Sequence, residues 1–307
     1  MLPNNTVNTA DNFPSRASII LAFATIYIVW GSTYFFNKVV IQQIPPFFSA
    51  SIRFTMAGIL IFFMTKLLRI PFHFNKQNFF NASLAGILFL TLGNGGVVWA
   101  LQYVDSGFTA LLVSAQPLVL ILLLWLINGQ KISIRSLFGI ALGILGIYLL
   151  TSETKIVTTT QYVLGVGIIF CCLIVWAYGS IFVGKASLPP NTFVNSSLQM
   201  MIGGILMVPI SLVMGEDWSE IYQANTFTWL SLLYLITFGS IAAFTSFNFL
   251  LKYVSPEKVT TNTYVNPVVA LLLGNIFLKE PLTLRSLIAS LILLAGVFVI
   301  NTRKRTS

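Results

Sequence analysis

Long apolar runs separated by short polar breaks occupy the chain from residue 18 to residue 301. A helix that crosses roughly 30 Å of hydrocarbon needs about 20 predominantly apolar residues. Proline and charged residues mark the breaks, as at Pro45-Pro46 and Ser255-Pro256. The pattern therefore predicts ten transmembrane helices, at residues 18–40, 46–68, 79–103, 106–127, 134–151, 162–186, 191–214, 227–251, 257–278 and 282–301.

The composition shows which solvent surrounds these helices. Hydrophobic residues make up 56% of the 307 residues and charged residues 8%, and the mean hydropathy is +0.88. An ordinary soluble domain has about 25% charged residues. This chain lacks the charged surface that water requires, so we expect an all-α integral membrane protein whose main partner is the lipid bilayer.

The net charge of +9 does not indicate nucleic-acid binding, because the cations lie at the ends of apolar runs rather than on one face. With the N-terminus in the cytoplasm, twelve cations face that side: Arg16, Lys66, Arg69, Lys76, Lys131, Arg135, Lys185, Lys252, Lys258, Arg303, Lys304 and Arg305. Four face the opposite side: Lys38, Lys155, Lys279 and Arg285. Cytoplasmic loops carry the excess of Lys and Arg, so both termini are predicted to be cytoplasmic, in a bacterial inner membrane.

The two halves of the chain repeat each other at an offset of 150 residues. Pro117 corresponds to Pro267, and Arg135-Ser136-Leu137 corresponds to Arg285-Ser286-Leu287. We expect two five-helix repeats, residues 18–151 and 162–301, with cytoplasmic tails at 1–17 and 302–307. Because five is odd, the second repeat begins on the opposite side of the membrane and the repeats are inverted, an architecture of transporters with a central solute site.

Four segments carry a family resemblance: Trp30-Gly31-Ser32-Thr33-Tyr34, Pro45-Pro46 with Arg53-Phe54, Ser114-Ala115-Gln116-Pro117, and Asn266-Pro267 followed by Lys279-Glu280-Pro281-Leu282-Thr283. In this order they resemble the drug/metabolite transporter superfamily, in particular its EamA-type ten-helix members. The resemblance implies a central cavity enclosed by helices one to four and six to nine, with helices five and ten outside it. It also implies export. Gln130 stands where the family often has an acid, whereas Glu280 keeps it.

Two prolines lie near the centres of the fourth and ninth runs, each preceded by an amide. Proline removes a backbone donor and displaces the carbonyl four residues earlier, here at Val113 and Thr263. We predict helix kinks at Pro117 and Pro267. They either flank the solute or are satisfied by a neighbouring helix.

Polar and aromatic residues at depth are the other candidates. Trp30 and Trp176 are too central for interfacial anchors, so they either line a cavity or pack between helices. Arg53 is the one cation inside a run, so it either faces the interior or extends to the membrane surface. The candidate substrate-binding residues are Trp30, Ser32, Tyr34, Arg53, Asn94, Trp99, Gln116, Trp176, Tyr178, Asn248, Asn262 and Asn266.

These residues predict a transporter of small molecules. An uncharged, amide-rich and aromatic cavity favours neutral or zwitterionic metabolites such as amino acids, or amphiphilic drugs, exported by alternating access. A carrier that exchanges anionic sugars or nucleotide sugars is the alternative, although it would need more cations than Arg53. A membrane receptor or scaffold is a further alternative.

Other classes of function are not expected. No catalytic group, metal-ligand cluster or nucleotide-binding loop stands out, so neither enzyme activity nor a cofactor is predicted. Gly139 and Gly143 form a GxxxG motif, which predicts a close helix contact within the chain or in a homodimer.

Overall fold

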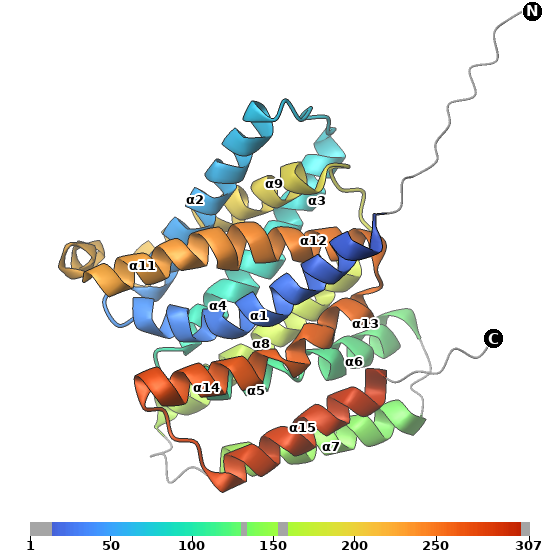
Figure 1. The fold of residues 1–307 in the computed structure, drawn as a ribbon, viewed down its shortest axis with the longest axis vertical. Coiled ribbons are helices and arrows are strands. Elements are labelled where there is room, and N and C mark those ends of the chain that lie inside the picture. The colour runs from blue at the N-terminus through green and yellow to red at the C-terminus, as the bar shows by residue number, and fades with distance from the viewer. Residues whose placement is uncertain (1–13, 130–133, 153–158, 302–307) are drawn as a thin grey trace, which may run out of the picture.

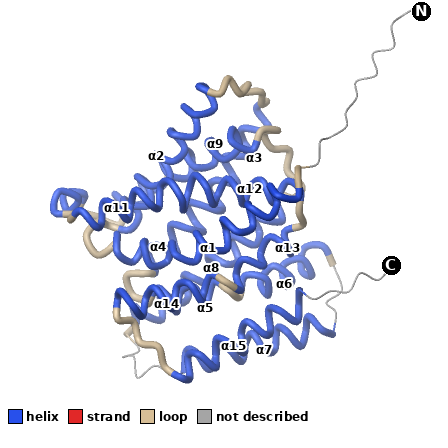
Figure 2. The backbone as a smooth tube through the Cα atoms, in the orientation of Figure 1, coloured by secondary structure: helices blue, strands red, loops and turns tan. Residues whose placement is uncertain are grey.

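The computed structural model describes residues 14–129, 134–152 and 159–301, and all regular elements within them are helical (Figure 2). Helices occupy each of the ten predicted runs. Among the described residues, seven helical stretches are long and apolar enough to cross a membrane: Arg16–Val40, Pro46–Leu67, Lys76–Ala100, Ser106–Ile127, Thr160–Val183, Thr192–Val213 and Thr226–Tyr253. Shorter apolar helices fill the remaining runs: Leu137–Gly146, Asn266–Leu278 and Leu284–Gly296.

The helices of the first predicted repeat are α1 (Arg16–Val40), α2 (Pro46–Leu67), α3 (Lys76–Gly86), the π-helix η1 (Ile87–Asn94), α4 (Gly95–Ala100), α5 (Ser106–Val113), α6 (Gln116–Asn128) and α7 (Ile134–Ser152). Those of the second are α8 (Thr160–Val183), α9 (Thr192–Ile205), α10 (Met207–Val213), the 3₁₀ helix η2 (Trp218–Gln223), α11 (Thr226–Tyr234), the π-helix η3 (Leu235–Ala242), α12 (Ala243–Tyr253), α13 (Pro256–Val259), the 3₁₀ helix η4 (Thr260–Tyr264), α14 (Asn266–Leu278) and α15 (Leu284–Asn301).

The two predicted proline kinks are helix interruptions. α5 ends at Val113, α6 begins at Gln116, and Pro117 lies in the first turn of α6. In the second half η4 precedes α14, and Pro267 occupies the corresponding place in α14. Proline fits the first turn of a helix, where its missing N–H has no intrahelical acceptor. Each proline thus begins a new helical segment rather than bending a continuous one.

Two π-helical segments lie within long helical stretches. η1 joins α3 to α4, and η3 joins α11 to α12. A π segment within an α-helix is rare and is frequently found at a functional site. Each segment contains a glycine, Gly93 in η1 and Gly239 in η3, and both glycines lie close to side chains of the cavity described below.

Helices of the first half pack against those of the second (Figure 1). α2 packs on α9, α5 on α14, and α7 on α15. α1 contacts α12 and α14, while α8 contacts α6, η1 and α4. The core therefore lies between the two halves of the sequence rather than within each half.

The α7–α15 pair forms one edge of the molecule, at the bottom of Figure 1. Glycines allow a close approach there. An added Cβ on Gly296 would lie 2.6 Å from the carbonyl oxygen of Gly139, and one on Gly146 would lie 2.8 Å from the backbone nitrogen of Leu293. The GxxxG motif at Gly139 and Gly143 therefore makes a close helix contact within the chain.

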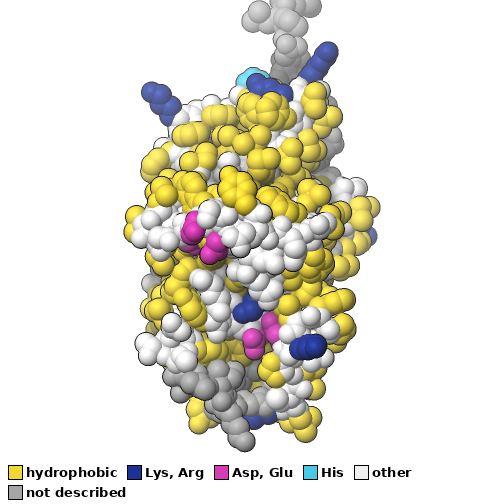
Figure 3. Space-filling model, turned by 90° about the vertical axis from the view of Figure 1, so that its left-hand side faces the viewer, with side chains coloured by type: hydrophobic (Ala, Val, Ile, Leu, Met, Phe, Trp, Pro, Cys, Tyr) yellow, Lys and Arg dark blue, Asp and Glu magenta, His cyan; other side chains and the backbone are white. Residues whose placement is uncertain are grey.

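Many large apolar side chains point outwards, as a surface in contact with lipid requires. Leu67 is 82% exposed and Val213 is 86% exposed. α1 begins and α15 ends at the same end of the molecule, on the right of Figure 1. Figure 3 shows the opposite end, where Asp and Glu side chains gather in two groups with Lys or Arg side chains near the lower group.

Candidate functional site

A cavity lies between the two halves of the chain. Its space is about 820 Å³, counting the part open to solvent. Eight predicted substrate-binding residues line it: Trp30, Tyr34, Arg53, Asn94, Gln116, Trp176, Asn262 and Asn266. None of the lining residues comes from α7 or α15 in the described parts of these helices.

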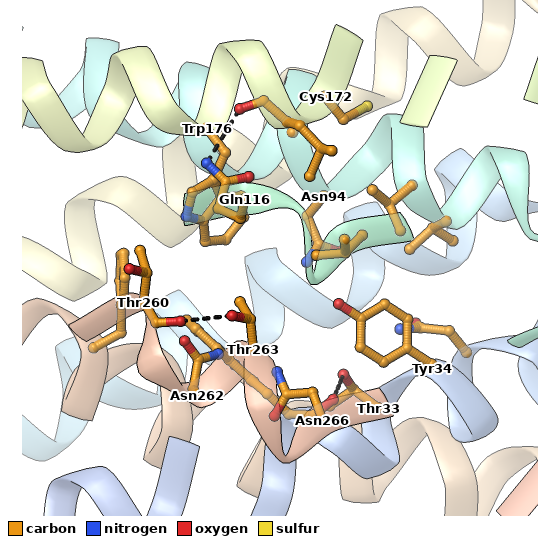
Figure 4. A pocket seen from close by; sticks show the side chains of 18 of the residues that line it. Thr33, Tyr34, Asn94, Gln116, Cys172, Trp176, Thr260, Asn262, Thr263 and Asn266 are labelled. Atoms are coloured by element: carbon orange, nitrogen blue, oxygen red, sulfur yellow. Dashed lines mark hydrogen bonds between the residues drawn. The ribbon is translucent and has the colours of Figure 1, made fainter. Parts of the chain in front are cut away.

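Amides project into the cavity from opposite walls (Figure 4). Asn94 and Gln116 lie on one wall, and Asn262 and Asn266 lie on the other. Nε2 of Gln116 donates to the carbonyl of Leu173 at 3.2 Å, whereas Oδ1 of Asn94 has no donor among the described residues. The helix interruptions at the two prolines place Gln116 and Asn266 at these positions.

With its amide turned so that donors face acceptors, Asn266 connects three helical segments. Its nitrogen donates to the carbonyls of Tyr27 and Asn262, both at 3.1 Å, and its oxygen accepts from Nδ2 of Asn262 at 3.0 Å. Asn266 therefore orients Asn262 and joins the start of α14 to α1 and η4. The hydroxyls of Thr33 and Thr263, near this wall, donate to carbonyls of their own helical segments, Trp30 at 2.7 Å and Thr260 at 2.8 Å.

Aromatic rings form a continuous apolar wall. The Trp30 ring lies 6.0 Å from that of Trp176, edge to face, and 5.1 Å from that of Phe247, measured between centroids. Phe89 supports this wall from behind, 5.0 Å from Trp176. Nε1 of Trp30 donates to the carbonyl of Gly239 at 3.3 Å, so the indole N–H has a partner and the rings offer an apolar surface to a solute.

Arg53 is the cation of the described lining. It is 2% exposed, so it faces the interior and does not extend to the membrane surface. Nε donates to Oγ of Ser240 at 2.8 Å, Nη1 donates to Oδ1 of Asn37 at 3.2 Å, and the guanidinium lies 4.6 Å from the centroid of the Phe54 ring. Among the described residues no carboxylate lies within salt-bridge distance of it.

Four predicted residues lie outside the lining. Oγ of Ser32 lies 2.7 Å from the Tyr234 hydroxyl, Trp99 packs on Tyr103, and Tyr178 is 46% exposed on the outer surface. Nδ2 of Asn248 donates to Oγ of Ser196 and to Oε1 of Gln199. Ser32 and Asn248 hold helices together, and Trp99 also packs against the buried apolar core.

Sequence reasoning missed polar residues that the structure adds to the lining: Thr33, Asn37, Cys172, Thr260 and Thr263. Helical spacing would have found two of them. Cys172 lies four residues before Trp176, and Asn37 lies seven residues after Trp30, so each shares a helix face with its tryptophan.

Two glutamates accept hydrogen bonds from the N-termini of helices. Glu216 accepts from the backbone N–H groups of Phe47 and Phe48 at 2.9 and 2.8 Å, in the first turn of α2. Glu280 accepts from the backbone N–H and Oγ of Ser106, at 2.8 and 2.9 Å, and from the N–H of Gly107 at 3.0 Å, in the first turn of α5. A helix N-terminus offers unpaired N–H donors and a positive dipole end, so each contact is charge-assisted.

A lysine and an aspartate stand beside Glu280. Nζ of Lys38 donates to the carbonyls of Leu101 and Val104 after the end of α4. In the loop before α5, burial raises the pKa of the Asp105 carboxyl, the negative charge of Glu280 adds to this effect, and the Lys38 ammonium opposes it. Asp105 therefore takes up a proton at a higher pH than an ordinary aspartate does.

Comparison with known proteins identifies a matching family and several relatives. The model of the EamA-like transporter family matches twice, over residues 17–152 and 163–302. The inner membrane transporter YedA of Escherichia coli, described by its name as uncharacterized, is 34% identical over 256 residues, 82% of this chain and 80% of its own length. The uncharacterized transporter YvbV of Bacillus subtilis is 26% identical over 95% of this chain and 93% of its own.

A solved crystal structure also matches. It covers 93% of this chain and 96% of its own length with a TM-score of 0.67, at 18% sequence identity. This likeness shows that the fold is shared.

Proposed function

We propose a function from the premise that this chain belongs to the EamA-like transporter family and is a transmembrane transporter of the drug/metabolite type. It moves small neutral or zwitterionic metabolites such as amino acids, or amphiphilic drugs, out of the cytoplasm across a bacterial inner membrane. The observation that carries this proposal is the cavity between the halves. Its described lining combines amides, an aromatic wall and one arginine, and contains no acidic residue.

Alternating access between two inverted five-helix repeats is the mechanism we propose. The helix pairings support it, because they recur when each helix is exchanged for its counterpart in the other half: α1 contacts α12 and α14, and α8 contacts α4, η1 and α6. The proline interruptions and the π segments also occur at corresponding places. Two related halves permit two related packings, each open to one side.

The glutamate contacts indicate which end is closed. Glu216 and Glu280 belong to the second half, while the helix N-termini they bind, those of α2 and α5, belong to the first. These bonds hold the halves together at the end that the distribution of Lys and Arg assigns to the outside. We therefore infer that the outer end is closed in this conformation.

The orientation of the chain gives a first prediction. Single cysteines that replace Asp217 and Lys252, in a background with Cys171 and Cys172 changed to serine, are expected to label from opposite sides. An impermeant maleimide added to intact cells should label Asp217→Cys, and Lys252→Cys only after the membrane is opened. Both original side chains are exposed, so access to the reagent is not limited by burial. Labelling of both positions in intact cells would contradict the proposed topology.

Transport itself is tested with purified protein in proteoliposomes. Vesicles loaded with unlabelled solute should accumulate labelled solute by counterflow, and the rate should saturate with concentration. The panel contains neutral amino acids, amphiphilic cations and a nucleotide sugar. Rates equal to those of empty liposomes for the whole panel would overturn the transporter proposal, and saturable exchange of the nucleotide sugar alone would replace its solute class.

A second prediction concerns the lining. Trp176→Ala and Asn266→Ala are each expected to lower the transport rate several-fold while leaving a folded protein, because the first removes part of the aromatic wall and the second frees Asn262. Tyr178→Ala is the matched control, since it removes an aromatic ring from the outer surface of the same helix. Transport rates and melting temperatures in detergent decide the outcome. Wild-type rates for both cavity variants would remove these residues from the site.

A further inference from the structure

We propose that Arg53 is the receptor for a carboxylate of the solute. The solute class is then a monocarboxylate with an apolar or aromatic body. This inference rests on the proposed function and specifies what the cavity recognises. Three features support it. The buried guanidinium has N–H donors without acceptors among the described residues, it is bound to the same segment as Trp30 of the aromatic wall, and its one positive charge can balance one negative charge of a solute.

The guanidinium is held in place but is not saturated. It has five N–H donors, and the described residues accept from two of its nitrogens, at Ser240 and Asn37. Both acceptors are neutral. A cation that is 2% exposed and has no anionic partner among the described residues is costly within a membrane. Since a carboxylate binds two guanidinium N–H groups side by side, a solute carboxylate would supply both the missing charge and the missing acceptors.

The aromatic wall and this guanidinium are both bound to the same segment, η3. Nε of Arg53 donates to the Ser240 hydroxyl, and Nε1 of Trp30 donates to the carbonyl of Gly239. Gly239 and Ser240 are consecutive residues of η3, and consecutive Cα atoms are about 3.8 Å apart. A solute whose carboxylate binds Arg53 therefore extends its body along Trp30 and onto Trp176 and Phe247.

One arginine balances one negative charge. The next cation on the same helix as Trp30 is Lys38, and its ammonium donates to the carbonyls of Leu101 and Val104, outside the lining. The other polar side chains of the described lining are amides, hydroxyls and one thiol. A dianionic phosphate or a nucleotide sugar would leave charge unbalanced in this cavity. The proposal therefore favours a monocarboxylate over these anions.

The test compares two solutes that differ at the carboxylate. Phenylalanine and phenylalaninamide share the apolar body, and only the first carries the anionic group. In competition against counterflow by the wild-type protein, phenylalanine is expected to bind at least about tenfold more tightly, a factor that corresponds to 1.4 kcal/mol. Arg53→Gln should abolish this difference by weakening phenylalanine while leaving phenylalaninamide nearly unchanged. Lys66→Gln, which removes an exposed cation from the same helix, should preserve it.

The outcomes separate the inference from the function. Absence of saturable counterflow for every solute of the panel overturns the transporter proposal. Counterflow with equal inhibition by both solutes, or with a tenfold preference that survives in Arg53→Gln, overturns the role of Arg53 and leaves the transporter proposal intact. If Arg53→Gln does not fold, as judged by gel filtration in detergent, the comparison of the two solutes on the wild-type protein decides alone.

Discussion

Gly204→Ala is expected to destabilise the protein by about 1–3 kcal/mol, because a methyl group has no space at this position. An added Cβ would lie 2.5 Å from Oγ1 of Thr55 and 2.6 Å from the backbone nitrogen of the same residue. The backbone atom cannot rotate away as a side chain can. α9 must therefore separate from α2, and buried contacts such as the one between Oγ of Ser197 and the carbonyl of Gly58 would be lost.

The neighbouring glycine, Gly203, allows a close approach on the other side of α9. A Cβ on Gly203 would lie 2.8 Å from the carbonyl oxygen of Gly86 and 2.8 Å from Cβ of Leu90. α9 is thus in close backbone contact with α2 through Gly204 and with α3 and η1 through Gly203. Gly203→Ala is therefore also expected to destabilise the protein.

Gly167→Ala is the matched control for Gly204→Ala. Gly167 lies in α8 and has no heavy atom within 4 Å of an added Cβ, so alanine should leave stability unchanged or raise it slightly through its higher helix propensity. Melting temperatures of purified protein in one detergent provide the measurement. Equal melting temperatures for Gly204→Ala and Gly167→Ala would show that α2 and α9 do not pack as described.

The second large effect is expected for Glu280→Ala. The variant loses the three hydrogen bonds from Ser106 and Gly107, and a hydrogen bond to a charged group typically contributes about 1.5–3 kcal/mol. The first turn of α5 is then left with unpaired donors, and the outer end of the cavity opens more often. A membrane-impermeant thiol reagent added from outside should react with a cysteine at Thr33 several-fold faster in Glu280→Ala than in its parent.

The control for this experiment is Asp217→Ala. Asp217 lies on the same end of the molecule, but its side chain is exposed, and Ser219 is its hydrogen-bond partner among the described residues. Its removal should leave the labelling rate of Thr33→Cys unchanged. Similar rates for both alanine variants would mean that Glu280 does not keep this end closed.

Much of the helix pattern could be predicted, because a membrane imposes one strong rule on sequence. A run of apolar residues must be helical, since unpaired backbone groups are too costly in lipid, and each predicted run does contain helix. What a hydrophobic run does not encode is its interior geometry. The interruption at Val113–Gln116 and the π segments depend on tertiary contacts and close glycine packing. The sequence therefore indicated a kink at Pro117 in a continuous helix and did not indicate the π segments.

The candidate site was predicted in part for a similar reason. Trp30 and Trp176 stand out as aromatic residues at the depth of the cavity, and both line it. Ser32 and Tyr178 each follow one of these tryptophans by two residues, and a residue two positions along an α-helix points about 200° away. Depth can be inferred from the position in a run, but the facing direction depends on the neighbouring helices.

The glycine contact between α7 and α15 bears on the proposed movement of the two halves. The backbones of these two helices approach each other closely at Gly139, Gly146 and Gly296. Neither helix contributes a described residue to the cavity. Sliding one helix along the other would bring larger side chains against the partner backbone at these close contacts. If the two halves rearrange as proposed, we therefore expect the seam between α7 and α15 to resist sliding and to act as the pivot of the movement.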